Sequence, residues 1–150
     1  MSLAEQFQQS RGKPIMVGDQ QIIQMYAIEM PTRAQVQLKW VSTHSNLKQG
    51  IKIKLDKGDI SVEGKKYQFI VLWQDTSPNI VNFTCLPKKK NSVLKIWNVW
   101  EIDGIEQAWV GDAGIVIDQT QTDLFRLNCS NGVDGPNFND LIFEVFVSKE

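Results

Sequence analysis

The chain has 150 residues, of which 42% are hydrophobic and 22% are charged, with a net charge of −1, two cysteines and one histidine. These values are typical of one soluble globular domain, and they exclude a collagen-like, disordered or disulfide-scaffold chain. The longest unbroken apolar run has only five residues, so no segment is expected to insert into a membrane. A site that needs two or three histidines is also excluded.

Residues 1–12 have the pattern of a short helix. Ser2 followed by Glu5 is a capping box, in which each residue caps the backbone of the other at the start of a helix. Gly12 follows at a distance where glycine commonly ends such a helix. We therefore expect a short N-terminal helix, or a loosely attached arm if the capping pattern is accidental.

Residues 19–30 fit two kinds of element. Their apolar side chains recur at helical spacing, but residues 21–28 also fit a strand. Later in the chain the alternation of apolar and polar residues is regular, which predicts strands with one buried face. The clearest of these strands are expected at residues 34–41, 51–55 and 141–147.

Two dipeptides predict β-hairpins. Glu63-Gly64 precedes a predicted strand at residues 65–73, and Asp103-Gly104 lies between two isoleucines. Such dipeptides accept the positive φ angles that tight hairpin turns require. Together with the other turn sequences, they divide the chain into about eight to ten strands. We therefore expect an all-β fold, an antiparallel β-sandwich of jelly-roll type, formed by the whole chain as a single domain.

Charge is distributed unevenly along the chain. Residues 35–95 carry a net charge of +7, and residues 96–150 carry a net charge of −8. One explanation is that basic and acidic strands lie side by side, with their outward side chains paired across the sheet. The other is that the fold has two electrostatic faces, one suited to an anionic partner and one to a cation, which would also favour formation of a homo-oligomer.

The loop before the C-terminal strand concentrates Asp, Asn and Gly residues. Side-chain and carbonyl oxygens of this kind are the ligands of Ca²⁺. The segment 137–143 (Asn-Phe-Asn-Asp-Leu-Ile-Phe) resembles the closing strand of calcium-associated bacterial surface β-sandwich domains, and this resemblance implies a structural calcium ion or a tight turn. The alternative is that the Asn and Asp side chains bond their own backbone. The candidate metal ligands are Asp134, Asn137, Asn139 and Asp140.

Five tryptophans are many for a chain of this length. Within residues 92–101 both alternating faces carry large side chains, so Trp97 and Trp100 are expected to point to opposite sides of one strand. Trp109 is expected on the partner strand of the second hairpin. A tryptophan facing solvent beside polar groups would form a platform for a sugar ring, whereas a buried one belongs to the core. The candidate ligand-binding residues are Trp97, Asn98, Trp100, Glu101, Gln107 and Trp109.

The remaining polar clusters are better explained by turns and solvated loops. The basic loop at residues 88–90 has no arginine, and the pI near 5.9 argues against a nucleic-acid partner. His44 lies in a polar turn, without a nucleophile elbow or a phosphate-binding glycine loop elsewhere. Cys85 and Cys129 are expected to be free buried thiols, or a disulfide if the protein is secreted.

These patterns predict a non-catalytic binding module for a carbohydrate or another polar surface, in which a calcium ion would be structural. The alternative is a small interaction or assembly domain that buries exposed aromatic residues against another protein or its own copy. An enzyme is the least favoured class. No secretory signal pattern is visible, so the cytoplasm is the default compartment, and an extracellular location applies if a signal was removed.

Overall fold

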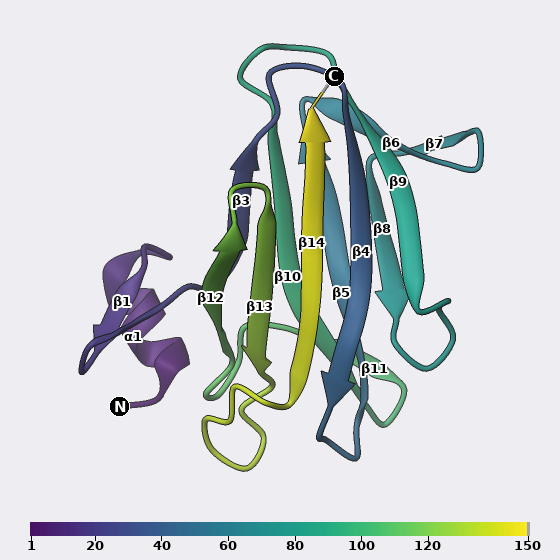
Figure 1. The fold of residues 1–150 in the computed structure, drawn as a ribbon. Helices are drawn as coiled ribbons and strands as arrows, with labels where there is room; N and C mark the ends of the chain where they lie inside the picture. Colours follow the sequence, from purple (N-terminus) through teal and green to yellow (C-terminus); the bar gives the residue numbers. More distant parts are fainter. Residues whose placement is uncertain (150) are drawn as a thin grey trace.

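The computed structural model describes residues 1–149. Two antiparallel β-sheets of five and seven strands pack against each other as a β-sandwich, and a separate two-stranded sheet lies near the N-terminus (Figure 1). The predicted fold class is therefore confirmed. Residues 1–149 form one helix and fourteen strands. This number exceeds the eight to ten strands expected from the turn sequences, because five of the strands have only three or four residues, and nine have five or more.

The larger sheet has seven strands, with the long strands β14 and β4 near its centre (Figure 1). All pairs along it are antiparallel. In spatial order its strands are β12 (Gly114–Gln121), β13 (Leu124–Ser130), β14 (Leu141–Lys149), β4 (Ala34–Thr43), β9 (Ile80–Pro87), β6 (Gly58–Val62) and β7 (Lys65–Tyr67).

The smaller sheet has five strands and lies behind the first in Figure 1. Its long strand β10 pairs with β5 along one side and with two short strands, β3 and β11, along the other. The strands are β3 (Tyr26–Glu29), β11 (Ile105–Gln107), β10 (Val93–Ile102), β5 (Lys48–Asp56) and β8 (Phe69–Trp73), and β8 forms the edge beyond β5.

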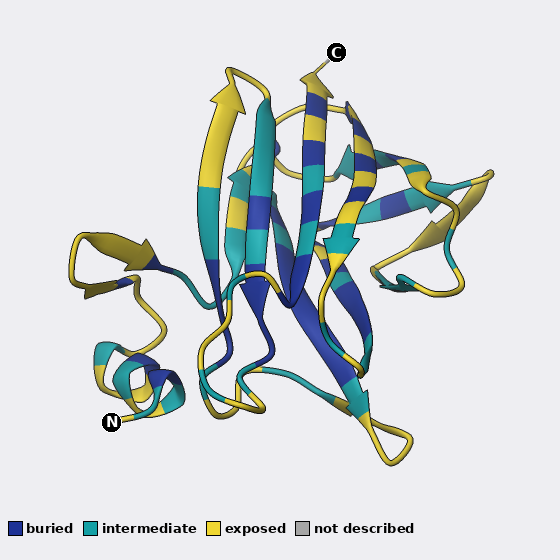
Figure 2. Cartoon of the chain, turned by 60° about the horizontal axis from the view of Figure 1, so that its bottom comes forward, coloured by how far each residue is buried: buried dark blue, intermediate teal, exposed yellow. Residues whose placement is uncertain are grey.

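The core lies between the two sheets, because the alternating apolar residues of both point inward. Figure 2 shows this as buried and less buried bands that alternate along the central strands. On β14, Leu141, Phe143, Val145 and Val147 are buried, as the sequence pattern predicted. Burial of each large apolar side chain contributes about 1.5–3 kcal/mol to folding.

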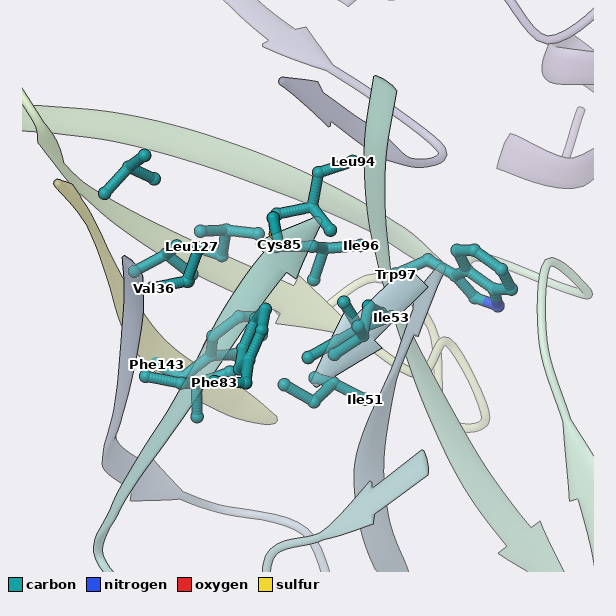
Figure 3. Packing of buried hydrophobic residues seen from close by; sticks show 14 of the residues in the cluster. Val36, Ile51, Ile53, Phe83, Cys85, Leu94, Ile96, Trp97, Leu127 and Phe143 are labelled. Atoms are coloured by element: carbon teal, nitrogen blue, oxygen red, sulfur yellow. The ribbon is translucent and has the colours of Figure 1, made fainter. Parts of the chain in front are cut away.

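Side chains of β10 occupy both faces of its sheet. Figure 3 shows Leu94 and Ile96 directed toward the packed cluster, with Trp97 on the opposite side of the strand. Trp40 of β4 meets Phe143 of β14 edge to face inside the core, with ring centroids 6.1 Å apart. The outward position of Trp97 is the first feature that leads to the candidate site.

The short N-terminal helix is confirmed as α1 (Leu3–Ser10). The Ser2 hydroxyl oxygen accepts a hydrogen bond from the Glu5 backbone N–H at 3.1 Å, which is the cap that the sequence predicted. Arg11 ends the helix in the left-handed region with φ 57°, and the Gly12 N–H donates to the Phe7 carbonyl at 2.8 Å. No helix formed by residues 1–149 is long and apolar enough to cross a membrane.

The helix is tied to the sandwich by contacts of both its backbone and its side chains. The Leu3 N–H donates to the Asp112 carboxylate at 3.0 Å, and the Ala4 N–H donates to the Gly111 carbonyl at 2.9 Å. Leu3 and Phe7 are buried in a small cluster with two isoleucines of the hairpin formed by β1 (Ile15–Val17) and β2 (Gln20–Ile22). Residues 1–12 are therefore packed against their neighbours in this structure.

Two expectations from the sequence need correction. Residues 19–30 form β2 and β3 and no helix, so the helical option is wrong there. The predicted strand at residues 65–73 is divided at Gln68 into β7 and β8, which belong to different sheets. Neither half shows the alternation that would mark the face of a sheet, because β7 is exposed throughout and β8 is apolar throughout, so periodicity does not reveal the change of sheet.

Both cysteines are free and fully buried, as expected for a chain without a visible signal. Burial raises the pKa of Cys85 to about 12. Burial, with a smaller effect from the Asp140 carboxylate, also raises the pKa of Cys129. Since the thiolate is the reactive form, neither cysteine is suited to be a nucleophile.

Candidate functional site

Four of the predicted ligand-binding residues lie on β10, and the side chains of three of them, Trp97, Asn98 and Trp100, are buried. Trp100 is 1% exposed and Asn98 is 3% exposed, and both belong to the inward face of the strand. The Asn98 amide donates to the Ser130 carbonyl of the opposite sheet at 3.0 Å. Asn98 therefore links the two sheets, and neither Asn98 nor Trp100 is accessible as a ligand platform in this structure.

Trp97 has the outward orientation that was expected, but another tryptophan covers it. The Trp97 and Trp109 rings lie with their centroids 5.0 Å apart and their planes inclined by 32°. Trp97 is buried as a result, while Trp109 keeps 39% of its surface exposed. Of the candidate tryptophans in this region, Trp109 alone presents an exposed ring.

Trp109 is held in an unusual backbone conformation. It follows β11 rather than belonging to it, and its φ angle is 59°, in the left-handed region that bulky residues rarely adopt. Its indole N–H donates to the Gln24 carbonyl at 3.1 Å, and its ring rests on Trp97. Strain of this kind persists where the surroundings hold it, and it clusters at ligand-binding sites.

The exposed ring of Trp109 forms one wall of a groove of about 620 Å³. The opposite wall is α1, and the chain between them contributes Gln24. The groove is therefore an apolar surface bordered by amide, carboxylate and guanidinium groups. Its lining residues are Ala4, Glu5, Phe7, Gln8, Arg11, Gly12, Gln24 and Trp109.

The groove residues on α1 were missed by the sequence analysis. The capping box identified the helix, but nothing in a single sequence indicates which part of a sandwich a short helix will pack against. Arg11 is the C-cap residue of α1 and has a left-handed backbone conformation. Within residues 1–149 it forms no ion pair. Its guanidinium group can therefore engage a ligand.

Glu101 and Gln107 are separated from this groove. Gln107 lies opposite Trp100 across the β10–β11 pair and therefore shares its side of the sheet, while Glu101 lies opposite Lys48 and Glu106. Both are partly exposed, near the tip of the hairpin at Asp103-Gly104. Asp103 and Gly104 have φ angles of 51° and 78°, so the predicted turn is confirmed.

The C-terminal loop forms a second, smaller pocket of about 260 Å³. Three of the four predicted calcium ligands, Asp134, Asn137 and Asp140, line it, and Asn139 does not. Asp140 is buried, and its Oδ2 accepts the Asn131 backbone N–H at 3.0 Å. The Asp140 carbonyl accepts bonds from the His44 N–H at 3.0 Å and the Gln49 side-chain amide at 2.6 Å. Asp140 thus fastens the loop to the 43–49 turn.

Burial is the main cause that raises the pKa of Asp140, and the nearby Asp134 carboxylate adds to it. Hydrogen bonds from the backbone N–H groups of Asn131 and Gly132 lower the pKa of Asp140 and so oppose this rise. The two acids are therefore close enough to interact.

The other predicted metal ligands follow turn chemistry. Asp134, Asn137 and Asn139 are exposed, and the Asn137 amide oxygen accepts the Asn139 backbone N–H at 3.0 Å. Residues 1–149 contain no group of three or more His, Cys, Asp and Glu side chains arranged to hold a metal ion. A cation here would have to be held by two carboxylates, amide oxygens and backbone carbonyls.

Outward charges pair across both sheets. Lys52 of β5 lies 3.6 Å from Glu106 of β11, on the far side of β10, and Arg126 of β13 lies 3.2 Å from Glu144 of the neighbouring β14. The first pair joins the basic part of the chain to the acidic part, whereas the second lies within the acidic part, so these pairs fit the cross-strand explanation for the uneven charge only in part. Exposed pairs of this kind contribute little to stability, commonly about 0–1 kcal/mol.

No protein-family model and no curated protein matches this sequence. The geometry of the two pockets is therefore the basis for a functional proposal.

Proposed function

We propose that the protein is a non-catalytic carbohydrate-binding module whose ligand lies in the groove between α1 and Trp109. The observation that carries the proposal is the exposed Trp109 ring, which is fixed by its bond to Gln24 and its contact with Trp97. A flat apolar surface bordered by polar groups suits a sugar, because pyranose rings combine an apolar face with hydroxyl groups at the rim.

The polar border supplies the groups that recognise hydroxyls. Gln8 and Gln24 carry amides that both donate and accept hydrogen bonds, and Arg11 supplies guanidinium donors. Because Trp109 is already fixed, binding does not require its side chain to be ordered, and such pre-organisation favours affinity. The groove is wide and open, which suits a ligand that lies across the surface.

The proposal is tested by NMR titration of the full chain with neutral and acidic oligosaccharides. The Trp109 indole N–H signal is assigned by its loss in Trp109→Phe, and a sugar that binds in the groove is expected to shift it. Trp109→Ala is expected to raise the Kd at least tenfold, about 1.4 kcal/mol. The matched control is Phe146→Ala, which removes an aromatic side chain of similar exposure from the outer face of the larger sheet.

A second pair of variants tests the helical wall. Gln8 lines the groove, whereas its exposed neighbour Gln9 does not. Gln8→Ala is expected to weaken binding, and Gln9→Ala is expected to leave it unchanged. If no oligosaccharide shifts the Trp109 signal, or if Trp109→Ala binds as tightly as the parent chain, the proposal is wrong.

The alternative function is a protein-interaction or assembly domain. One observation favours it independently of the groove: β8 is an apolar strand with an open edge. The two functions are compatible, because β8 and the groove involve different strands.

A further inference from the structure

Strand β8 is an edge strand without the protection that the other edges have. Its five residues, Phe69–Trp73, are all apolar, and none of them is buried. Lysines protect β7, acidic residues lie on β3 and β11, and the exposed half of β12 is polar. Charged side chains on edge strands prevent pairing with other chains, and β8 carries none.

The open edge affects the inward side of β8 as well. Ile70 and Leu72 lie opposite Ile53 and Ile51 of β5, which are fully buried. Ile70 and Leu72 pack against the same core but remain partly exposed, because β8 has no neighbouring strand beyond its edge. On the outward side, Phe69 has 51% of its surface exposed.

The register of the β5–β8 pair shows which backbone groups of β8 are available. The Gln74 N–H donates to the Gln49 carbonyl at 2.8 Å, and the Leu55 N–H donates to the Gln68 carbonyl at 3.3 Å. In an antiparallel ladder the residues that face one neighbour alternate along the strand. The even-numbered residues 68–74 therefore face β5, and the odd-numbered Phe69, Val71 and Trp73 direct their N–H groups to the open edge. The C=O groups of Phe69 and Val71 point the same way, whereas the Trp73 C=O already accepts the Thr76 and Ser77 backbone N–H groups at 3.2 Å and 3.0 Å.

We infer that β8 pairs with β8 of a second copy of this chain, antiparallel and about a two-fold axis at Val71. In this register Val71 lies opposite its own copy, and Phe69 lies opposite Trp73. Val71 can pair with its copy through both its N–H and its C=O, and the Trp73 N–H of each copy faces the Phe69 C=O of the other, so the available hydrogen-bonding groups of the two edges are self-complementary.

The side chains match in the same register. Phe69 and Trp73 form a cross-strand aromatic pair, and such pairs stabilise antiparallel strands. Ile70 lies opposite Leu72, and both gain the cover that the open edge lacks. Each aromatic ring already has a lysine ammonium over it, at 4.8 Å for Lys52 on Phe69 and 5.1 Å for Lys48 on Trp73.

Charge at the two ends of β8 is also complementary. Lys65 and Lys66 of β7 precede the strand across the corner at Gln68, and Asp75 follows it in the turn after Trp73. Antiparallel pairing brings the basic end of each copy to the acidic end of the other, whereas parallel pairing would place like charges together. These charges, with the self-complementary register, select a second copy as the partner.

The inference is tested by the mass of the full chain in solution, measured by sedimentation equilibrium, and by two variants of Val71. Val71→Pro removes the outward N–H at the axis, and proline is tolerated on an edge strand where the N–H does not serve the native sheet. We expect the parent chain to be a dimer and Val71→Pro to be a monomer, with both showing the same circular dichroism spectrum.

Val71→Cys tests the position of the axis. Opposed residues of an antiparallel pair lie within the distance that a disulfide bridges, and both native cysteines are buried and unreactive. Mild oxidation is expected to give a covalent dimer of Val71→Cys. The matched control is Gln119→Cys. Gln119 is exposed on β12, an edge strand of the larger sheet, and this variant is expected to remain uncrosslinked.

A monomeric parent chain at its highest soluble concentration would overturn the inference. So would a dimer that persists in Val71→Pro, or one that crosslinks through Gln119→Cys rather than through Val71→Cys. None of these results depends on sugar binding, so the groove and the β8 edge can fail separately.

Discussion

The rings of Trp97 and Trp109 lie with their centroids 5.0 Å apart, although one belongs to the regular strand β10 and the other to the loop after β11. The hairpin at Asp103-Gly104 returns the chain, and the left-handed backbone of Trp109 then directs its ring onto Trp97. The Trp109 ring thus covers Trp97 on the outward side of β10, and the exposed part of the Trp109 ring lines the groove.

The contact predicts measurable coupling between the two tryptophans. In a double-mutant cycle of Trp97→Ala, Trp109→Ala and the double variant, the free energy of unfolding is expected to show a coupling of about 0.5–1.5 kcal/mol. Urea denaturation supplies the three differences. Coupling within error of zero would mean that the rings do not contact each other in solution.

Much of the fold was predictable because it depends on local patterns. Alternating apolar residues identified the central strands, and the dipeptides Glu63-Gly64 and Asp103-Gly104 identified two tight turns. These signals depend on residues near one another in the sequence. The division of residues 65–73 between two sheets depends instead on how the sheets are packed, and the sequence carries no periodic sign of it.

The candidate site was predictable only in part. Trp109 was predicted on the partner strand of the second hairpin, and it lies just after that strand. Asn98 was predicted to bind a ligand, but it is buried and its amide donates to the Ser130 carbonyl of the opposite sheet. A polar residue on a strand that alternates normally faces solvent. Asn98 faces the core instead, where its amide has a hydrogen-bond partner. Gln8 and Arg11 reach the groove through the docking of α1, which is a long-range contact.

The C-terminal loop predicts the response to calcium. The Asp140 carboxylate is already bonded by backbone N–H groups, and the Asn137 amide oxygen caps its own turn. We therefore expect the same Tm in excess Ca²⁺ and in EDTA, measured by thermal denaturation. A ligand that bound only the native state at 100 times its Kd would add about 2.7 kcal/mol, so a bound ion would be seen easily.

The matched variant for the loop is Asp134→Asn, which removes the exposed carboxylate and keeps the size of the side chain. If the loop needs no ion, the Tm of Asp134→Asn is expected to be equally independent of Ca²⁺. A rise in Tm with Ca²⁺ in the parent chain that disappears in Asp134→Asn would show instead that the loop is a calcium site.

Asp140 also predicts a specific dependence of stability on pH. Its pKa in the folded chain is raised above the ordinary value of 3.8, chiefly by burial, so the folded state binds this proton more tightly than the unfolded state does. The resulting stabilisation is fully present below the unfolded pKa and is lost as the pH rises through the folded pKa. Asp140→Asn cannot titrate and lacks this contribution.

The measurement is the difference in free energy of unfolding between the parent chain and Asp140→Asn, from urea denaturation across acidic and neutral pH. Subtraction removes the titration of all other groups that the two chains share. The difference is expected to favour the parent chain increasingly as the pH falls toward 3.8, and to be constant at neutral pH. In an Asp134→Asn background the change should be smaller, because the Asp134 charge contributes to the raised pKa of Asp140. A difference that is independent of pH would show that the Asp140 carboxyl titrates alike in both states.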